Sequence, residues 1–245
     1  MPNRFIQKLQ GFAELSREEV AALEQATSLP AAYATRKHLI LEGDTPGPVF
    51  VVLEGWAIRY KVLPTGTRQI MAFLMPGDAC DLHIGMLDEM DHSIETITQA
   101  TVATIASGAM TDLMGNPGIA QAMYVAQLVD EATLRAWIVS LGRRNSVERA
   151  AHLLLELYMR AIRVGLIRGG DMELPLTQTV IADALGMTPV HINRVLQLLR
   201  KSGAIDLRRG HLTIPDPAPL IRLSGFDDNY LHRRLGSSLK YRTTS

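Results

Sequence analysis

The sequence holds a single cysteine, Cys80, among its 245 residues, so no disulfide forms within the chain. It also lacks an apolar run long enough to span a bilayer. Residues 1–25 are polar and charged, unlike the apolar core of a secretory leader. Together these absences predict a protein of the reducing cytoplasm that does not enter a membrane.

Motifs of the common enzyme classes are missing as well. The chain has no P-loop, no G-x-S-x-G, no H-E-x-x-H and no H-x-H pair. His38, His83 and His92 are scattered, whereas a metal-dependent cupin needs two or three histidines and a carboxylate that converge inside a barrel. We therefore expect neither enzymatic activity nor a metal site.

Charge is balanced over the whole chain but not along it. The 25 Lys and Arg match the 25 Asp and Glu, which gives a formal net charge of zero. Residues 1–115 hold 8 basic and 14 acidic side chains, whereas residues 186–222 hold 6 basic and 2 acidic ones. Such a basic C-terminal segment is typical of a surface that meets phosphate groups.

The segment Leu176–Ile214 contains two short helical patterns that meet at a glycine. Thr177 is suited to cap the first helix, and Gly186 ends it because glycine turns the chain without a Cβ penalty. Thr188 and Pro189 begin a second helix, where a hydroxyl accepts from a free N–H and proline loses no hydrogen bond. The second helix has a polar face opposite its apolar stripe of Ile192, Val195, Leu196 and Leu199. This pattern predicts a helix-turn-helix.

In such a motif, the second helix reads base edges in the major groove of DNA. Arg194 is the best candidate base reader, because a guanidinium pairs bidentately with guanine. The side chains near it on the polar face, the start of the first helix and a basic hairpin after Asp206 complete the expected contact surface. The residues that we expect to contact DNA are Thr177, Gln178, Thr188, Val190, His191, Asn193, Arg194, Gln197, Arg208 and Arg209.

Other interpretations of this segment remain open. A helical hairpin with a solvated charged face has the same apolar spacing. For the whole chain, the alternatives are a cupin-like metalloenzyme and an interaction module that does not bind DNA. The helix-turn-helix pattern and the charge partition favour the DNA-binding interpretation over both.

The first half of the chain has the pattern of a β domain. Gly43, Gly55, Gly66 and Gly77 recur every 11 or 12 residues in turn-like settings. Short strands at this spacing predict a jelly roll or barrel, preceded by short helices. The expected strands are Val49–Leu53, Trp56–Val62, Arg68–Leu74, His92–Thr98 and Thr101–Ala106.

A long helix is expected to follow from Asn116, with Gly142 as its break. Apolar and small residues recur along it at steps of three and four, which predicts a seam against a second copy of the chain. A helix buried within one subunit is the alternative. The seam residues are Ile119, Ala122, Ala126, Val129, Thr133, Ala136 and Ser140.

The order of β-roll, long helix and winged helix-turn-helix resembles the Crp/Fnr family of bacterial transcription regulators. The motifs that carry the resemblance are LILEGD, VFVVLEGWAIRY, the PGD turn and GMTPVHINRVLQLLRKSGAI, within residues 5–222. The resemblance implies an α+β fold and a homodimer on a near-palindromic operator of double-stranded DNA, with RNA polymerase as a further partner. The expected parts are a double-stranded β-roll sensor domain (1–115), a dimerisation helix (116–142), a winged helix-turn-helix (143–222) and a tail (223–245).

The resemblance also implies where a small signal would bind in the β-roll. The ribose- and phosphate-holding pairs of cyclic-nucleotide-binding members fall at Cys80-Asp81 and His92-Ser93. Asp81 is shorter than the family's Glu, and His92 is not a fixed cation, so tight binding of cAMP is not expected.

The resemblance also raises two other cofactors, an iron–sulfur cluster and a heme, but the residues that would bind them are poorly represented. One cysteine cannot hold an iron–sulfur cluster. A heme bound by Pro2, Cys80 and His83 is possible by residue type, but a packed cysteine and a surface histidine explain the same residues. The effector thus remains unknown, and Cys80, Asp81, His83, His92 and Ser93 are its candidate contacts.

Overall fold

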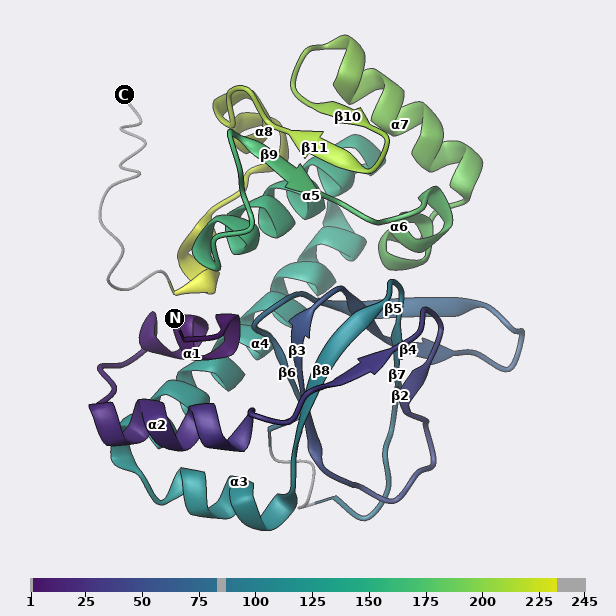
Figure 1. Cartoon of the computed structure of the whole chain (residues 1–245). Coiled ribbons are helices and arrows are strands. Elements are labelled where there is room, and N and C mark those ends of the chain that lie inside the picture. The colour runs from purple at the N-terminus through teal and green to yellow at the C-terminus, as the bar shows by residue number, and fades with distance from the viewer. Residues whose placement is uncertain (1, 83–86, 233–245) are drawn as a thin grey trace.

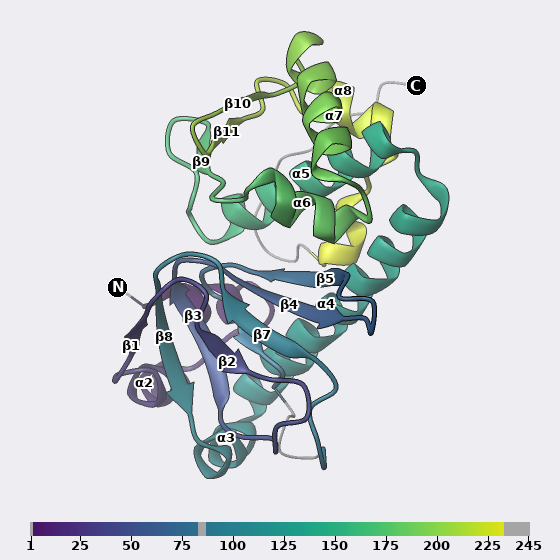
Figure 2. The ribbon, with the colours of Figure 1, turned by 90° about the vertical axis from the view of Figure 1, so that its right-hand side faces the viewer.

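The computed structural model describes residues 2–82 and 87–232. Figure 1 shows two bodies, a β-roll with helices at its side and a helical domain above it. Figure 2 shows α4 (Pro117–Arg143) running along the β-roll and up to the second body. The mixed α and β architecture confirms the predicted fold class.

The β-roll consists of two four-stranded antiparallel sheets. Their strand orders are β1-β8-β3-β6 and β2-β7-β4-β5. Apolar side chains on the facing sides form the core because strand residues alternate between two faces. The strands are β1 (Ala31–Tyr33), β2 (His38–Ile40), β3 (Val49–Glu54), β4 (Ala57–Val62), β5 (Arg68–Leu74), β6 (Ala79–Cys80), β7 (Ser93–Thr96) and β8 (Ala100–Ile105).

The turn between β3 and β4 requires glycine. Gly55 has φ 77°, and a Cβ there would overlap the carbonyl oxygen of Gln99. The helices α1 (Arg4–Gln10), α2 (Arg17–Ala26) and α3 (Ser107–Met114) lie beside the roll, as Figure 1 shows. Phe5, Ile6 and Leu9 of α1 are buried in the same core as the strands.

The residues predicted to form a seam with a second copy of the chain lie mostly on the face of α4 that packs against its own β-roll. Ile119, Ala122 and Val129 are buried in the core of the chain's own β-roll. The periodicity identified a buried face correctly, but it carried no information on what covers that face. Gly142 also lies inside the helix, which ends at Arg143. The opposite face exposes residues with the same spacing, Tyr124, Leu128, Glu131, Arg135 and Ile138.

The second body begins with α5 (Ser146–Arg163). Asn145 caps it in a capping box with Glu148, whose carboxylate accepts from the Asn145 backbone N–H. The rest of this body consists of β9 (Asp171–Glu173), α6 (Gln178–Leu185), α7 (Pro189–Lys201), β10 (Asp206–Arg208), β11 (His211–Thr213), α8 (Ala218–Ser224) and η2 (Asp228–Leu231). Among the residues that the structure describes, no helix is long and apolar enough to cross a membrane.

Candidate nucleic-acid interface

The boundaries of α6 and α7 are set by the predicted residues. Thr177 Oγ1 accepts from the Val180 N–H at 3.2 Å and thereby caps α6. Gly186 then turns the chain with φ 63°. Thr188 Oγ1 accepts from the His191 N–H at 3.3 Å, and Pro189 is the first residue of α7. These predictions of the helix boundaries are confirmed.

One side of α7 is buried and the other is exposed. Ile192, Val195, Leu196 and Leu199 pack into the core of the second body. Opposite them, Val190 keeps 64% of its surface exposed. A shallow hollow on this exposed side is lined by Gln178, Pro189, Val190, Asn193, Arg194 and Gln197.

This hollow brings together five of the residues expected to contact DNA. No acidic side chain lines it. Gln197 Nε2 donates to Asn193 Oδ1 at 3.0 Å within the hollow. His191 is exposed on α7 but does not line the hollow. Thr177 and Thr188 also lie at exposed helix starts, where their hydroxyls can still donate to a phosphate oxygen.

The basic hairpin forms as predicted, with one strand more. Arg209 and Gly210 have φ 52° and 80°, the two positive values that a tight hairpin turn needs. Arg208 pairs with Asp206 at 2.8 Å, and Arg209 is exposed at the tip. The sequence pattern did not predict β9, which pairs with β11 and widens the wing to three strands. A strand of three residues far from its partner leaves little periodicity to detect.

The helix-turn-helix is docked on the β-roll through α6. Arg68 of β5 contacts Asp183 of α6 and Glu95 of β7, each at 2.8 Å. Gln69 Nε2 donates to the Ala184 carbonyl at 3.1 Å. Figure 1 shows α6 facing the β-roll and α7 beyond it. The β-roll therefore does not cover the exposed face of α7 within the chain.

The candidate effector residues of the β-roll are already engaged with one another. Asp81 accepts from Arg59 Nη2 at 2.6 Å and contacts His92 Nε2 at 2.9 Å. His92 Nδ1 lies 2.6 Å from Asp91. Arg59 was not predicted as part of this site, because it lies on a strand among apolar residues and its partner is 22 residues away.

The charges in this network stabilise each other. Burial opposes ionisation of Asp81, but the hydrogen bond from His92 and the Arg59 charge outweigh it and lower the pKa of Asp81. Burial likewise disfavours the imidazolium, but the hydrogen bond and charge of Asp81 raise the pKa of His92. Arg59, Asp81 and His92 therefore form an internal ion network in this chain.

Two other candidate contacts of the effector, Ser93 and Cys80, are buried. Ser93 is buried, and its Oγ accepts from the Glu42 N–H at 3.0 Å. Cys80 is fully buried, and burial raises the pKa of its thiol. The thiol is therefore protonated at neutral pH, which suits neither a redox switch nor a thiolate ligand. His83 lies outside the described residues. Among those, no group of three or more His, Cys, Asp and Glu is placed to hold a metal ion.

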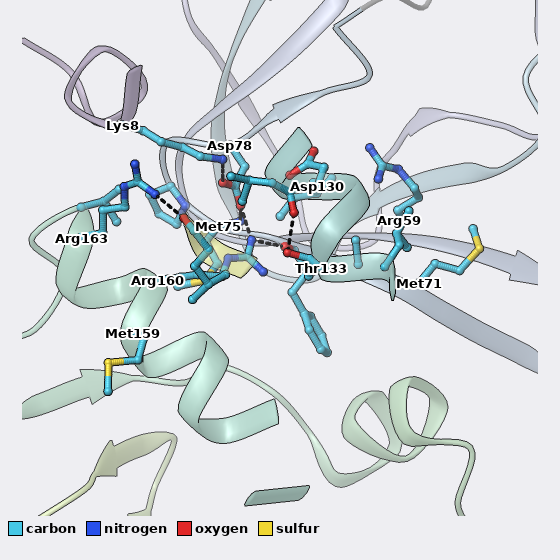
Figure 3. A pocket seen from close by; sticks show the side chains of 18 residues that line it. Lys8, Arg59, Met71, Met75, Asp78, Asp130, Thr133, Met159, Arg160 and Arg163 are labelled. Atoms are coloured by element: carbon cyan, nitrogen blue, oxygen red, sulfur yellow. Dashed lines mark hydrogen bonds and ion pairs between the residues drawn. The ribbon is translucent and has the colours of Figure 1, made fainter. Parts of the chain in front are cut away.

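A second cluster of charges joins both bodies at a cavity beside α4 (Figure 3). Asp78, after β5, accepts from Lys8 of α1 and Arg160 of α5, each at 2.6 Å. Lys8, Arg59, Asp130, Thr133 and Arg160 all line this cavity. The residues that line this cavity therefore connect the β-roll with α4 and α5.

The fold and the reading face define a class of protein, a DNA-binding regulator with a helix-turn-helix on a cyclic-nucleotide-type β-roll. Residues 31–116 match the model of a cyclic nucleotide-binding domain, and residues 148–223 match that of a Crp-like helix-turn-helix domain. The chain belongs to the Crp/Fnr family of transcription regulators.

Relatives of known sequence and structure agree with this assignment. The nitrogen fixation regulation protein FixK of Azorhizobium caulinodans is 26% identical over 206 residues, 84% of this chain and 82% of that protein. The transcriptional activator protein FnrL of Cereibacter sphaeroides is 27% identical over 224 residues, 89% of this chain and 88% of that protein. The structure of FixK2 from Bradyrhizobium japonicum has a TM-score of 0.72 at 23% identity and covers 86% of this chain and 98% of that one.

Proposed function

We propose that the chain acts in the cytoplasm as a homodimer that places α7 of each subunit in the major groove of a near-palindromic operator. Arg194 reads a guanine, and Val190 packs against a thymine methyl group. Thr177, Gln178, Thr188 and His191 contact the phosphate backbone near the helix starts, and Arg208 and Arg209 do so from the wing. The single observation that carries the proposal is the exposed hollow on α7, lined by polar, cationic and apolar groups without a carboxylate.

The exposed face of α4 supports the proposed dimer. Tyr124, Leu128, Glu131, Arg135 and Ile138 follow one another at steps of four and three, the spacing of a two-helix seam. Leu128 and Ile138 keep 53% and 70% of their surface exposed in the single chain. A second copy would cover these apolar side chains and relate the two reading helices by a two-fold axis.

A signal that modulates DNA affinity belongs to the β-roll in this proposal. A signal that changed the contacts around the cavity of Figure 3 would act beside Met71 of the roll, Thr133 of α4 and Met159 of α5. Its binding free energy would thereby act on the angle between the two bodies. We propose that RNA polymerase is the further partner, on the strength of the family relationship alone.

Selection of bound duplexes from random DNA tests the proposal. The full chain should enrich one two-fold-related sequence whose half-sites are separated by about one helical turn. Repeating the selection with a metabolite extract tests the signal. Enrichment of no sequence, with only uniform salt-sensitive binding, would reject the assignment of α7 as a base reader.

A further inference from the structure

Two amide side chains lie one helical turn apart on the exposed side of α7. Gln197 Nε2 donates to Asn193 Oδ1 at 3.0 Å. Residues at i and i+4 are neighbours on a helix, so the bond forms without bending the backbone. Both amides line the hollow that Val190 and Arg194 also line. The bond favours an orientation of Asn193 in which Oδ1 faces Gln197 before any DNA is bound.

The atoms that remain available on Asn193 match one base edge. Gln197 occupies one lone pair of Oδ1, which leaves the second lone pair and both N–H groups of Nδ2. This side-by-side acceptor and donor matches the N6 amino group and the N7 atom of adenine. Guanine presents two acceptors in the major groove, so Oδ1 would face an acceptor there. Cytosine offers a donor without an adjacent acceptor, and thymine offers an acceptor beside a methyl group.

We propose that Asn193, positioned by Gln197, reads an adenine in each operator half-site next to the guanine read by Arg194. Asn193 and Arg194 are consecutive on α7 and line one hollow, so the bases they contact are neighbours. This inference rests on the proposed function, because it requires α7 to enter the major groove. Asn193 is the residue that touches the base, and Gln197 is a positioning residue that acts through Asn193.

The role of Gln197 separates this mechanism from a general contribution of α7 to binding. Without its donor, Asn193 turns freely and presents its oxygen and nitrogen in either order. Gln197→Met removes the donor but keeps the length of the side chain. We expect this variant to lose part of its discrimination at the adenine position while it retains guanine discrimination through Arg194.

The experiment alters single atoms of the operator. The full chain first selects duplexes from random DNA. The adenine beside the guanine is then replaced by 7-deazaadenine, which lacks the N7 acceptor, or by purine, which lacks the N6 amino group. Fluorescence anisotropy should show that each analogue weakens wild-type binding by at most about 150-fold, the upper limit for a whole bidentate contact, because each analogue removes one of its two hydrogen bonds. Asn193→Ala should bind the natural site and both analogues equally, and Gln197→Met should show an intermediate ratio.

His191→Ala is the matched control, since His191 is exposed on the same helix but outside the hollow. This variant should change the affinity for the natural site and for both analogue sites by the same factor, so the ratio between them should equal that of the wild type. Equal responses of wild type and Asn193→Ala to the analogues, or selected half-sites without adenine beside the guanine, would overturn adenine reading. Loss of guanine dependence in Arg194→Ala would still support α7 as the reading helix in that case. If no sequence is selected at all, the proposed function fails, and the adenine contact fails with it.

Discussion

Arg160 of α5 donates to Asp78 of the β-roll at 2.6 Å, and both side chains are largely removed from solvent. The same guanidinium nitrogen also donates to the Phe73 carbonyl at 2.7 Å. Lys8 of α1 completes the environment of the carboxylate at 2.6 Å. The Asp78 carboxylate therefore connects the β-roll to both α1 and α5, the first helix of the second body (Figure 3).

Asp78→Asn should destabilise the protein in a pH-dependent manner. Burial opposes ionisation of Asp78, but the charges of Lys8 and Arg160 outweigh it and lower the pKa to about 2. A lowered pKa means that the stabilisation is present above the ordinary value of 3.8 and is lost as the pH falls towards 2. At neutral pH the variant removes the carboxylate charge beside two largely buried cations, Lys8 and Arg160, so we expect a loss of about 3 kcal/mol. Urea unfolding between pH 7 and 2 measures this difference.

Asp112→Asn is the control for that measurement, because Asp112 is exposed on α3. It should leave the unfolding free energy unchanged across the same pH range. A difference between wild type and Asp78→Asn that stays constant down to pH 2 would show that the carboxylate charge is not the source of the stabilisation.

Arg68→Gln should loosen the contact between α6 and the β-roll. The variant removes both ion pairs of Arg68, with Asp183 and with Glu95. Because Arg68 is only partly buried, the global stability should fall by less than about 1 kcal/mol. Hydrogen exchange of the α6 amides should nevertheless become faster, since α6 loses a tether to the sheet. Lys61→Gln removes an ion pair with Glu42 inside the β-roll and should not affect α6; equal exchange in both variants would contradict the tether.

Cyclic AMP should not raise the melting temperature of the wild-type chain. Asp81 and His92, the two groups that we expect at the ribose and phosphate positions, already contact each other, and Asp81 also binds Arg59. A nucleotide would have to break that network before it could form its own contacts. Thermal unfolding with and without millimolar cAMP measures the effect. A large stabilisation would mean that the network opens readily and that the family's nucleotide site persists.

Ile138→Asp should convert the protein to a monomer. The side chain is 70% exposed in the single chain and lies in the proposed seam of α4. A buried aspartate on each side of a two-fold axis would place two charges together in an apolar contact. Light scattering at micromolar concentration distinguishes the two states. Leu63→Asp places the same charge on the β4–β5 turn, where the side chain is 52% exposed, and should leave the mass unchanged; a dimeric Ile138→Asp protein would reject this seam.

Local chemistry made much of the fold predictable. The caps at Thr177, Gly186 and Thr188 depend on residues within four positions of each other. The strands β3 and β5 are β-rich stretches between regularly spaced glycines. The helical spacing of the apolar residues in α7 also predicted which side of this helix is exposed. Such features are determined by neighbours along the chain, so one sequence is enough to infer them.

The predictions that were wrong or incomplete depend on distant partners. The face of α4 that looked like a dimer seam packs on the chain's own β-roll, and only the three-dimensional structure could show this. Arg59 contacts Asp81, 22 positions away in the sequence, and β9 pairs with a strand 40 residues later. The periodicity of either segment does not indicate which distant residue or strand it contacts.

The most direct test of the account is the affinity of Arg194→Ala for the selected operator. Arg194 is exposed in the hollow of α7, whereas Arg200 lies on the same helix outside it and donates to the Leu207 carbonyl. We predict that Arg194→Ala loses at least about fivefold in operator affinity in a gel-shift titration, with non-specific binding retained. Arg200→Ala should keep the preference for the operator over random DNA. Unchanged operator affinity in Arg194→Ala would contradict the central claim that this face of α7 reads DNA.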